Sequence, residues 1–102
     1  MEYLLKISPK AEEDFDGIYN YVIKDGESIA KNQIAVILDA LETLKLFPET
    51  GIKLSNKIST ANDYRFLVIN KTYIAFYKIH DGFIGVYRIL RKEQDYLKAL
   101  DF

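Results

Sequence analysis

The chain has 102 residues, of which 49% are hydrophobic and 28% charged, and it contains no cysteine. This length and composition predict one globular domain over residues 1–102 and exclude an intrinsically disordered chain, which needs low hydrophobicity and high net charge. The absence of cysteine excludes disulfides, a thiolate nucleophile and cysteine-based metal sites. Because His80 is the single histidine, a histidine-rich metal site is excluded as well. We therefore expect no metal and no cofactor.

The formal net charge of -1 conceals an uneven distribution of charge. Residues 1–50 carry a net charge of -5, whereas residues 51–102 carry +4. Such asymmetry indicates a surface that faces a polyanion or a protein partner. The apolar runs are shorter than the about 18–20 residues of a membrane span, and the first residues lack the pattern of a signal peptide. We therefore expect a cytoplasmic protein with no membrane partner.

The first half of the chain predicts a strand followed by a helix. The short apolar run Tyr3–Ile7 is typical of a strand. Ser8 and Pro9 suit the N-cap and first position of a helix, and Gly26 suits a left-handed residue that ends it. Between them, apolar residues recur at helical spacing at Ala11, Phe15, Ile18, Tyr19 and Val22. The acids Glu12, Glu13, Asp14 and Asp16 are expected on a solvated face that complements the start of this helix.

A second helix is predicted from about Ser28 until Phe47 and Pro48 end it. Because only a few residues separate the two apolar stripes, we expect an antiparallel helical hairpin that packs on a flat surface. The polar stretch from Pro48 to Asp63 has little periodicity and predicts a linker.

The second half has the pattern of strands. Three runs rich in Ile, Val, Phe and Tyr lie at Tyr64–Ile69, Thr72–His80 and Phe83–Leu90. The Asp-Gly pair between the last two is the strongest short signal for a hairpin, and its flanking His80 is expected to be exposed. With a possible final helix at Lys92–Leu100, the order is β-α-α-β-β-β(-α). The fold class is α+β, with the helical hairpin on one face of a mainly antiparallel four-stranded sheet.

Hairpin register predicts which strand residues share a face. A two-residue turn places His80 opposite Phe83, Lys78 opposite Gly85 and Ala75 opposite Arg88. We assign to the helices the set Ile74, Phe76, Phe83, Tyr87 and Ile89. We assign to the outside the set Tyr73, Ala75, Tyr77, Ile84, Val86 and Arg88.

Arg65 has two possible positions. An even-length turn at Asn70 and Lys71 places it on the helix side, whereas a three-residue or bulged turn places it beside Tyr73, Tyr77 and Arg88. We favour the second, because an unpaired arginine under the helices would be costly.

Several segments, taken in order, resemble the RelE/ParE family of toxins over essentially the whole chain. They are Ile7-Ser8-Pro9-Lys10-Ala11-Glu12-Glu13-Asp14, Leu44-Lys45-Leu46-Phe47-Pro48, Tyr64-Arg65, Tyr73-Ile74-Ala75-Phe76-Tyr77, Val86-Tyr87-Arg88-Ile89-Leu90 and Asp95-Tyr96-Leu97. The resemblance implies the toxin of a type II toxin–antitoxin module, of the kind linked to plasmid stabilisation. It also implies growth inhibition, neutralisation by a cognate antitoxin, and contact with operator DNA only through that antitoxin.

The family implies two targets, DNA gyrase for ParE-like members and ribosome-bound mRNA for RelE-like members. RNA cleavage without a metal needs a group that deprotonates the 2′-hydroxyl, cations on the phosphate and a positioned acid or tyrosine. Arg65, Arg88, Arg91, Tyr73 and Tyr96 could supply these groups, and the candidate catalytic residues of such an mRNA interferase are Arg65, Arg88, Arg91 and Tyr96. The candidate antitoxin-binding or target-binding residues are Tyr73, Tyr77, Arg65 and Arg88.

The sequence departs from the RelE pattern at two places. Ile74 stands where RelE-type ribonucleases usually carry an arginine, and Glu93 and Gln94 stand where an arginine pair is common. The strand sequences are closer to the ParE branch. Three hypotheses follow: a gyrase inhibitor, a metal-independent mRNA endoribonuclease, and a non-toxic member that acts as an antitoxin-binding corepressor.

Overall fold

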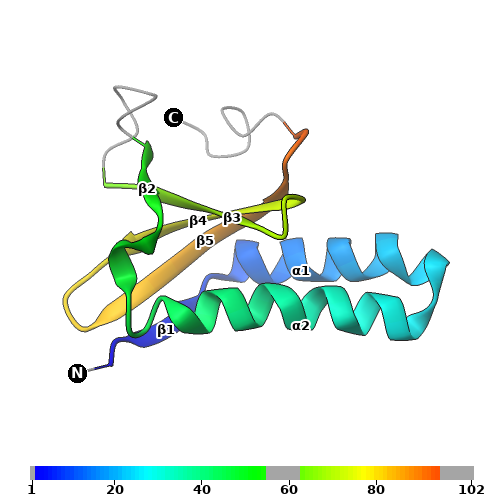
Figure 1. The fold of residues 1–102 in the computed structure, drawn as a ribbon, viewed down its shortest axis with the longest axis horizontal. Coiled ribbons are helices and arrows are strands. Elements are labelled where there is room, and N and C mark those ends of the chain that lie inside the picture. Colours follow the sequence, from blue (N-terminus) through cyan, green and yellow to red (C-terminus); the bar gives the residue numbers. More distant parts are fainter. Residues whose placement is uncertain (1, 55–62, 95–102) are drawn as a thin grey trace.

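A sheet with two helices against one of its faces forms the fold in the computed structural model, which describes residues 2–54 and 63–94 (Figure 1). The strands are β1 (Leu4–Ile7), β2 (Ile52–Lys53), β3 (Arg65–Ile69), β4 (Tyr73–Ile79) and β5 (Phe83–Arg91). The helices are α1 (Pro9–Val22) and α2 (Glu27–Thr43), and the short 3-10 helices are η1 (Ile23–Asp25) and η2 (Pro48–Thr50). The predicted α+β class and the predicted order of the main elements are confirmed.

The sheet has five strands in the order β1-β5-β4-β3-β2. All neighbours are antiparallel except β1 and β5, which are parallel because the helical hairpin carries the chain back across the sheet. The prediction of four strands was wrong by one short strand. β2 lies inside the stretch predicted as a linker, and its two residues are too few to give a period-2 pattern.

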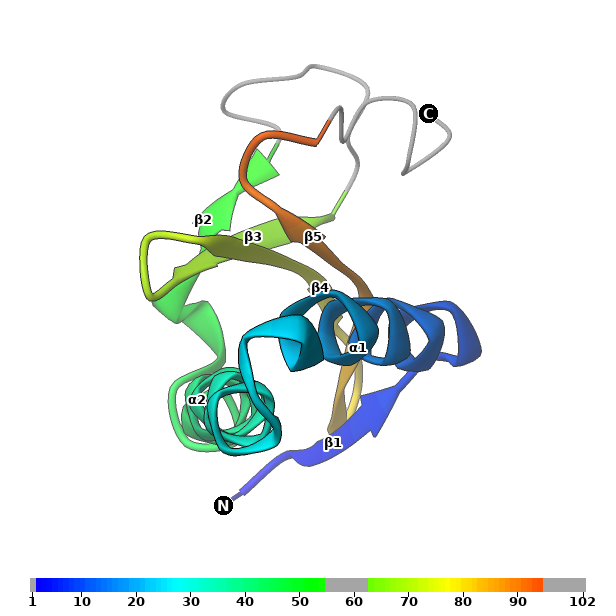
Figure 2. The same ribbon diagram turned by 90° about the vertical axis from the view of Figure 1, so that its right-hand side faces the viewer.

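Capping residues close in sequence determine where α1 begins and where η1, which follows it, ends. The Ser8 hydroxyl accepts a hydrogen bond from the Ala11 amide at 3.1 Å, and Pro9 occupies the first helical turn. Gly26 follows η1 with φ +126° and ψ 145°, so it does end the segment with a positive φ, although its ψ is not that of the left-handed helical conformation. Viewed end on, both helices lie on the same side of the sheet (Figure 2).

The second helix stops earlier than predicted. It ends at Thr43, and the amides of Leu44, Lys45 and Leu46 then bond to the carbonyl groups three residues back. These tighter turns bring the chain to Pro48 without continuing the helix.

Most of the sheet residues lie on the face opposite to the one predicted, whereas Ile89 packs against the helices and Arg88 lies on the face away from them, as predicted. Residues assigned to the outside pack against the helices in the main core, where they are Tyr73, Ala75, Tyr77, Ile84 and Val86. On the other face lies a second cluster formed by Leu54, Ile74, Phe76 and Leu90, with Tyr64 and Phe66 against it. The prediction treated tyrosine as an outward residue, but the Tyr77 hydroxyl is fully hydrogen-bonded inside the fold, which removes the cost of burying it.

A β-bulge in β5 changes the register halfway along the hairpin. Lys78 pairs with Gly85 as predicted, but Phe76 pairs with Arg88 and Tyr77 with Val86, which leaves Tyr87 as the extra residue. Ala75 therefore pairs with Ile89 and not with Arg88. The bulge places Ile89 in the helix-facing core and Arg88 opposite a residue of the outer face.

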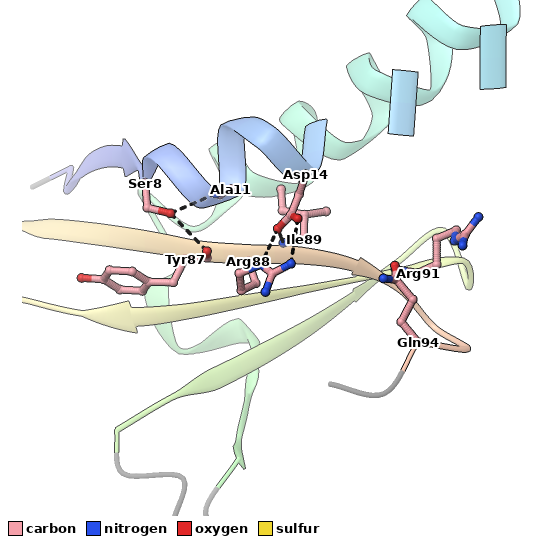
Figure 3. Close-up of polar contacts among 8 residues, drawn as sticks. All are labelled: Ser8, Ala11, Asp14, Tyr87, Arg88, Ile89, Arg91 and Gln94. Atoms are coloured by element: carbon pink, nitrogen blue, oxygen red, sulfur yellow. Dashed lines mark hydrogen bonds and ion pairs between the residues drawn. The ribbon is translucent and has the colours of Figure 1, made fainter. Parts of the chain in front are cut away.

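Beyond Val86, no strand of the described part of the chain lies beside the outer edge of β5, because β1 pairs only as far as Ile7. Three polar side chains bond to its backbone instead. The Ser8 hydroxyl donates to the Tyr87 carbonyl at 3.1 Å, and the Asp14 carboxylate accepts from the Ile89 amide at 2.9 Å. The Gln94 amide oxygen accepts from the Arg91 amide at 2.7 Å (Figure 3).

The predicted final helix lies mostly outside the described residues. Its first residues, Lys92 to Gln94, form a turn in which the Gln94 amide bonds to the Arg91 carbonyl at 3.0 Å. The rest of the prediction concerns residues 95–100, which the structure does not describe.

Candidate functional site

Arg88 is held by Asp14 in a two-point ion pair that joins β5 to α1. The Nε atom of Arg88 lies 2.8 Å from Oδ2 of Asp14, and its Nη2 atom lies 2.9 Å from Oδ1 (Figure 3). Only 15% of the Arg88 side chain and 12% of the Asp14 side chain are exposed. The hydrogen bond from Asp14 raises the pKa of Arg88, although burial acts in the opposite direction. This guanidinium therefore already has a carboxylate partner within the fold.

Arg65 lies at the start of β3, two strands away from Arg88. It pairs in register with Tyr77, and its Nη1 atom donates to the Gly51 carbonyl at 2.8 Å. The turn between β3 and β4 has three residues, because Ile69 pairs with Tyr73, so the favoured prediction for this turn is confirmed. Arg65 shares a face with Tyr77, as predicted, but that face looks toward the helices, and Arg88 is not on it.

The tyrosines Tyr73 and Tyr77 are buried. Tyr77 is 0% exposed, and its hydroxyl donates to the Pro48 carbonyl at 2.7 Å and accepts from the Gly51 amide at 2.8 Å. Burial raises the pKa of Tyr77, and the hydrogen bond from Gly51 partly opposes that rise. Burial also raises the pKa of Tyr73, which is 4% exposed. Both rings are part of the core.

Arg91 stands at the end of β5, in register with Tyr73. Its guanidinium carbon lies 4.7 Å from the ring centroid of Tyr21, and its Nε atom lies 3.5 Å from Oε1 of Glu93. The structure thus brings Arg91 to Tyr73 and Arg65 to Tyr77, but it does not gather Arg65, Arg88 and Arg91 around one point. Tyr96 lies outside the described residues.

Asp14 and the pair of His80 and Tyr87 are structurally important residues that the sequence analysis missed. Asp14 was expected on a solvated face, yet it stands three residues after Ala11 and four before Ile18, which places it on the buried stripe of α1. That spacing was the available signal.

His80 was expected to be exposed, but it is half-buried. Its Nε2 atom lies 2.7 Å from the Tyr87 hydroxyl, and its ring stacks on Phe83. The Tyr87 ring lies over Gly85, where a Cβ atom would come within 2.7 Å of the Tyr87 hydroxyl oxygen. No sequence pattern indicated this contact, because it depends on the bulge.

Neither a metal cluster nor a membrane span is found in the described part of the chain. No three His, Asp or Glu side chains in residues 2–54 and 63–94 are placed to hold a metal ion. Within the same ranges, no helix has the length and apolar character needed to cross a membrane.

Comparison with known proteins identifies the family. The model of the ParE toxin of the type II toxin–antitoxin system parDE matches residues 5–96. A solved structure of a chromosomal ParDE toxin–antitoxin system from P. aeruginosa matches with a TM-score of 0.77 and 22% identity, covering 90% of this chain and 98% of that one. A solution structure of a conserved hypothetical protein from Helicobacter pylori matches with a TM-score of 0.55 and 15% identity, covering 90% of this chain and 97% of that one. No curated protein matches. Because the family model covers most of the sequence, the chain belongs to the ParE toxin family of type II toxin–antitoxin systems.

Proposed function

We propose that this chain is a growth-inhibiting toxin that acts in the cytoplasm by binding DNA gyrase, and that its cognate antitoxin neutralises it. The family match supports the toxin–antitoxin assignment. One structural observation supports binding over RNA cleavage: each of the three candidate arginines is engaged at a different place in the fold.

Cleavage of RNA without a metal needs several groups to converge on one phosphate. Arg65 and Arg91 pair with Tyr77 and Tyr73, which are four residues apart along β4, or about 13 Å at the usual rise of a strand. Arg88 pairs with Phe76 of the outer face and is bound to Asp14. This separation favours contacts spread over a protein interface rather than one reaction centre.

The arginines and tyrosines have different parts in this proposal. Arg65 and Arg91 are the half-buried cations on which the target or the antitoxin is bound. Tyr77 and Tyr73 pair with them in register from β4, and their buried rings fix this strand between β3 and β5, which carry the two arginines. Arg88 fixes α1 against β5 and so holds the two elements of the interface in their relative position.

The test is induced expression in bacteria with and without the small gene that adjoins this one. We expect growth arrest and relaxed plasmid DNA without the antitoxin, intact mRNA ends, and rescue when both genes are expressed. Purified protein is expected to inhibit supercoiling by purified gyrase, and Arg65→Ala and Arg91→Ala are expected to weaken that inhibition.

Other outcomes favour the other hypotheses. New mRNA ends at the ribosomal A site, together with normal plasmid supercoiling, would reject gyrase as the target and support the endoribonuclease. No growth arrest, with repression of the operon only when the antitoxin is present, would support the corepressor, which contacts operator DNA through its partner.

A further inference from the structure

Three residues of α1 form a stripe along the side of a cavity. Glu13, Gly17 and Tyr21 are spaced by four residues, so they lie one above another on the helix. The cavity has a volume of about 280 Å³. Its remaining lining comes from α1, from the strands and from the turn after them, and it consists of Asp14, Ile18, Val22, Tyr73, Ile89, Arg91 and Gln94.

Gly17 has no explanation inside the described fold. Glycine is, after proline, the least favourable residue in a helix interior. Each of the other four glycines has a reason to be glycine. Gly26 and Gly82 have positive φ, and Gly51 and Gly85 have no room for a Cβ atom. At Gly17, by contrast, φ is not positive, and an added Cβ would meet no atom of residues 2–54 and 63–94 within 4 Å, apart from the backbone of its own helix and its two chain neighbours.

A glycine without a conformational or packing reason often allows a ligand or another chain to come close to the backbone. The space above Gly17 opens into the cavity, whose floor is formed by the apolar side chains of Ile18, Val22 and Ile89. We call this space the Gly17 notch, and it is defined by Glu13, Gly17, Tyr21 and that floor.

The charges at the two ends of the Gly17 notch differ. At one end, Glu13 forms no ion pair with any described residue. At the other end, the Arg91 guanidinium lies over the Tyr21 ring. A long basic side chain fits this arrangement, because its aliphatic stem can lie on the apolar floor while its cation reaches Glu13 and stays away from Arg91.

We propose that the Gly17 notch receives a lysine or arginine side chain from a segment of the antitoxin that crosses α1 at Gly17. This proposal rests on the antitoxin partnership of the proposed function. Charge complementarity supports a basic segment: within α1, Lys10 is the single basic residue against the three exposed acids Glu12, Glu13 and Asp16, while the fourth acid, Asp14, is already paired with Arg88. The half of the chain that contains both helices has a net charge of -5.

The test measures binding of the purified protein encoded by the adjoining small gene to variants of this chain, by calorimetry at low and high salt. Gly17→Leu fills the notch, and we expect it to raise the Kd by at least about tenfold, as occlusion of a buried anchor does. Asn20→Leu is the matched control, since Asn20 is an exposed residue of the same helix that does not line the cavity, and we expect a change below about twofold. Glu13→Gln is expected to weaken binding and to reduce its dependence on salt.

A thermal unfolding measurement accompanies each variant. Gly17→Leu is expected to unfold at the same or a higher temperature than the parent chain, because leucine favours a helix. If Gly17→Leu fails to fold, Gly17→Gln takes its place with the same expectation, and Glu13→Gln gives an independent result.

Three results would overturn the proposal. If the notch-filling variant and Glu13→Gln bind the antitoxin as the parent chain does, the notch is not occupied, while the toxin–antitoxin assignment stands. If the parent chain does not bind the adjoining gene's product at all, the proposed partnership fails as well. If light scattering shows a dimer that Gly17→Leu converts to a monomer, the occupant is a second copy and not the antitoxin.

Discussion

At the scale of single residues, Asp14 joins the two halves of the fold. Its carboxylate accepts two hydrogen bonds from Arg88 and one from the Ile89 amide. Because both charged side chains are largely buried, removing one of them takes away the opposite charge that the other contacts in a poorly solvated place. Removing one partner of this pair therefore costs more stability than removing one partner of an ion pair on the surface.

We expect Asp14→Ala to lower the free energy of unfolding by about 2–4 kcal/mol, because it leaves the Arg88 guanidinium and the Ile89 amide without this acceptor. Urea denaturation measures the change. Asp16→Ala is the matched control, since Asp16 is an exposed acid of the same helix, and its effect is expected to be below about 0.5 kcal/mol. Equal effects of the two substitutions would show that the ion pair adds no stability.

The sequence allowed prediction of some individual residues and not of others. Ser8 and Pro9 were predicted correctly, because a helix start depends on its own few residues. Asp14 was not, since its partner lies 74 positions away in the chain and only the packing of α1 on β5 brings the two together.

At the scale of elements, the segment from η2 to β2 is fixed to the sheet through Gly51. Its amide donates to the Tyr77 hydroxyl at 2.8 Å and its carbonyl accepts from Arg65 at 2.8 Å. A Cβ atom at Gly51 would lie 2.5 Å from the Tyr77 hydroxyl oxygen and 2.7 Å from the Phe66 carbonyl oxygen. There is accordingly no space here for any side chain.

The same substitution is expected to have opposite effects at two glycines. Gly51→Ala is expected to destabilise the protein by about 1–3 kcal/mol, because it overpacks the contact with Tyr77. Gly17→Ala meets open space in a helix and is expected to stabilise it by about 0.5–1 kcal/mol. Thermal and urea unfolding of the two variants give the comparison, and a loss of stability at both positions would contradict it.

The elements themselves were predictable, but their faces were not. Periodicity and turn residues identified both main helices and the three longer strands of the second half, because each of these signals is local. The bulge at Tyr87 is an exception to strand alternation, and it makes any register derived from the turn wrong beyond Tyr77. β2 was missed because a two-residue strand has no period.

At the scale of the whole molecule, burial of tyrosine hydroxyls makes stability depend on alkaline pH. Burial raises the pKa of three tyrosines in the fold, which are Tyr64, Tyr73 and Tyr77. As the pH rises above about 10, the ordinary tyrosine pKa, the unfolded chain loses these protons before the folded chain does. Fewer protons are then bound in the unfolded state, so stability is fully present below that pH and falls above it.

We expect the free energy of unfolding, measured by urea denaturation, to be nearly constant between about pH 8 and 9.5 and to fall above about pH 10. Tyr73→Phe removes one of the titrating hydroxyls, and its stability is expected to fall less steeply over the same alkaline range. Parallel slopes for the variant and the parent chain would show that Tyr73 does not contribute to the pH dependence.

The global architecture could be predicted more fully than the candidate site. The order of elements and the α+β class depend on hydrophobic patterns that extend over many residues, so one wrong turn does not change them. The positions of Arg65, Arg88 and Arg91 depend on the register, the bulge and one ion pair, none of which has a local pattern.

The three side chains that bond to the outer edge of β5 have a consequence for the self-association of this chain. An unpaired strand edge is a template on which identical chains add to one another and aggregate. Ser8, Asp14 and Gln94 already occupy backbone groups at Tyr87, Ile89 and Arg91 that such a chain would need. A second copy of this chain therefore finds these three backbone groups already bonded, and self-association by strand addition is disfavoured at this edge.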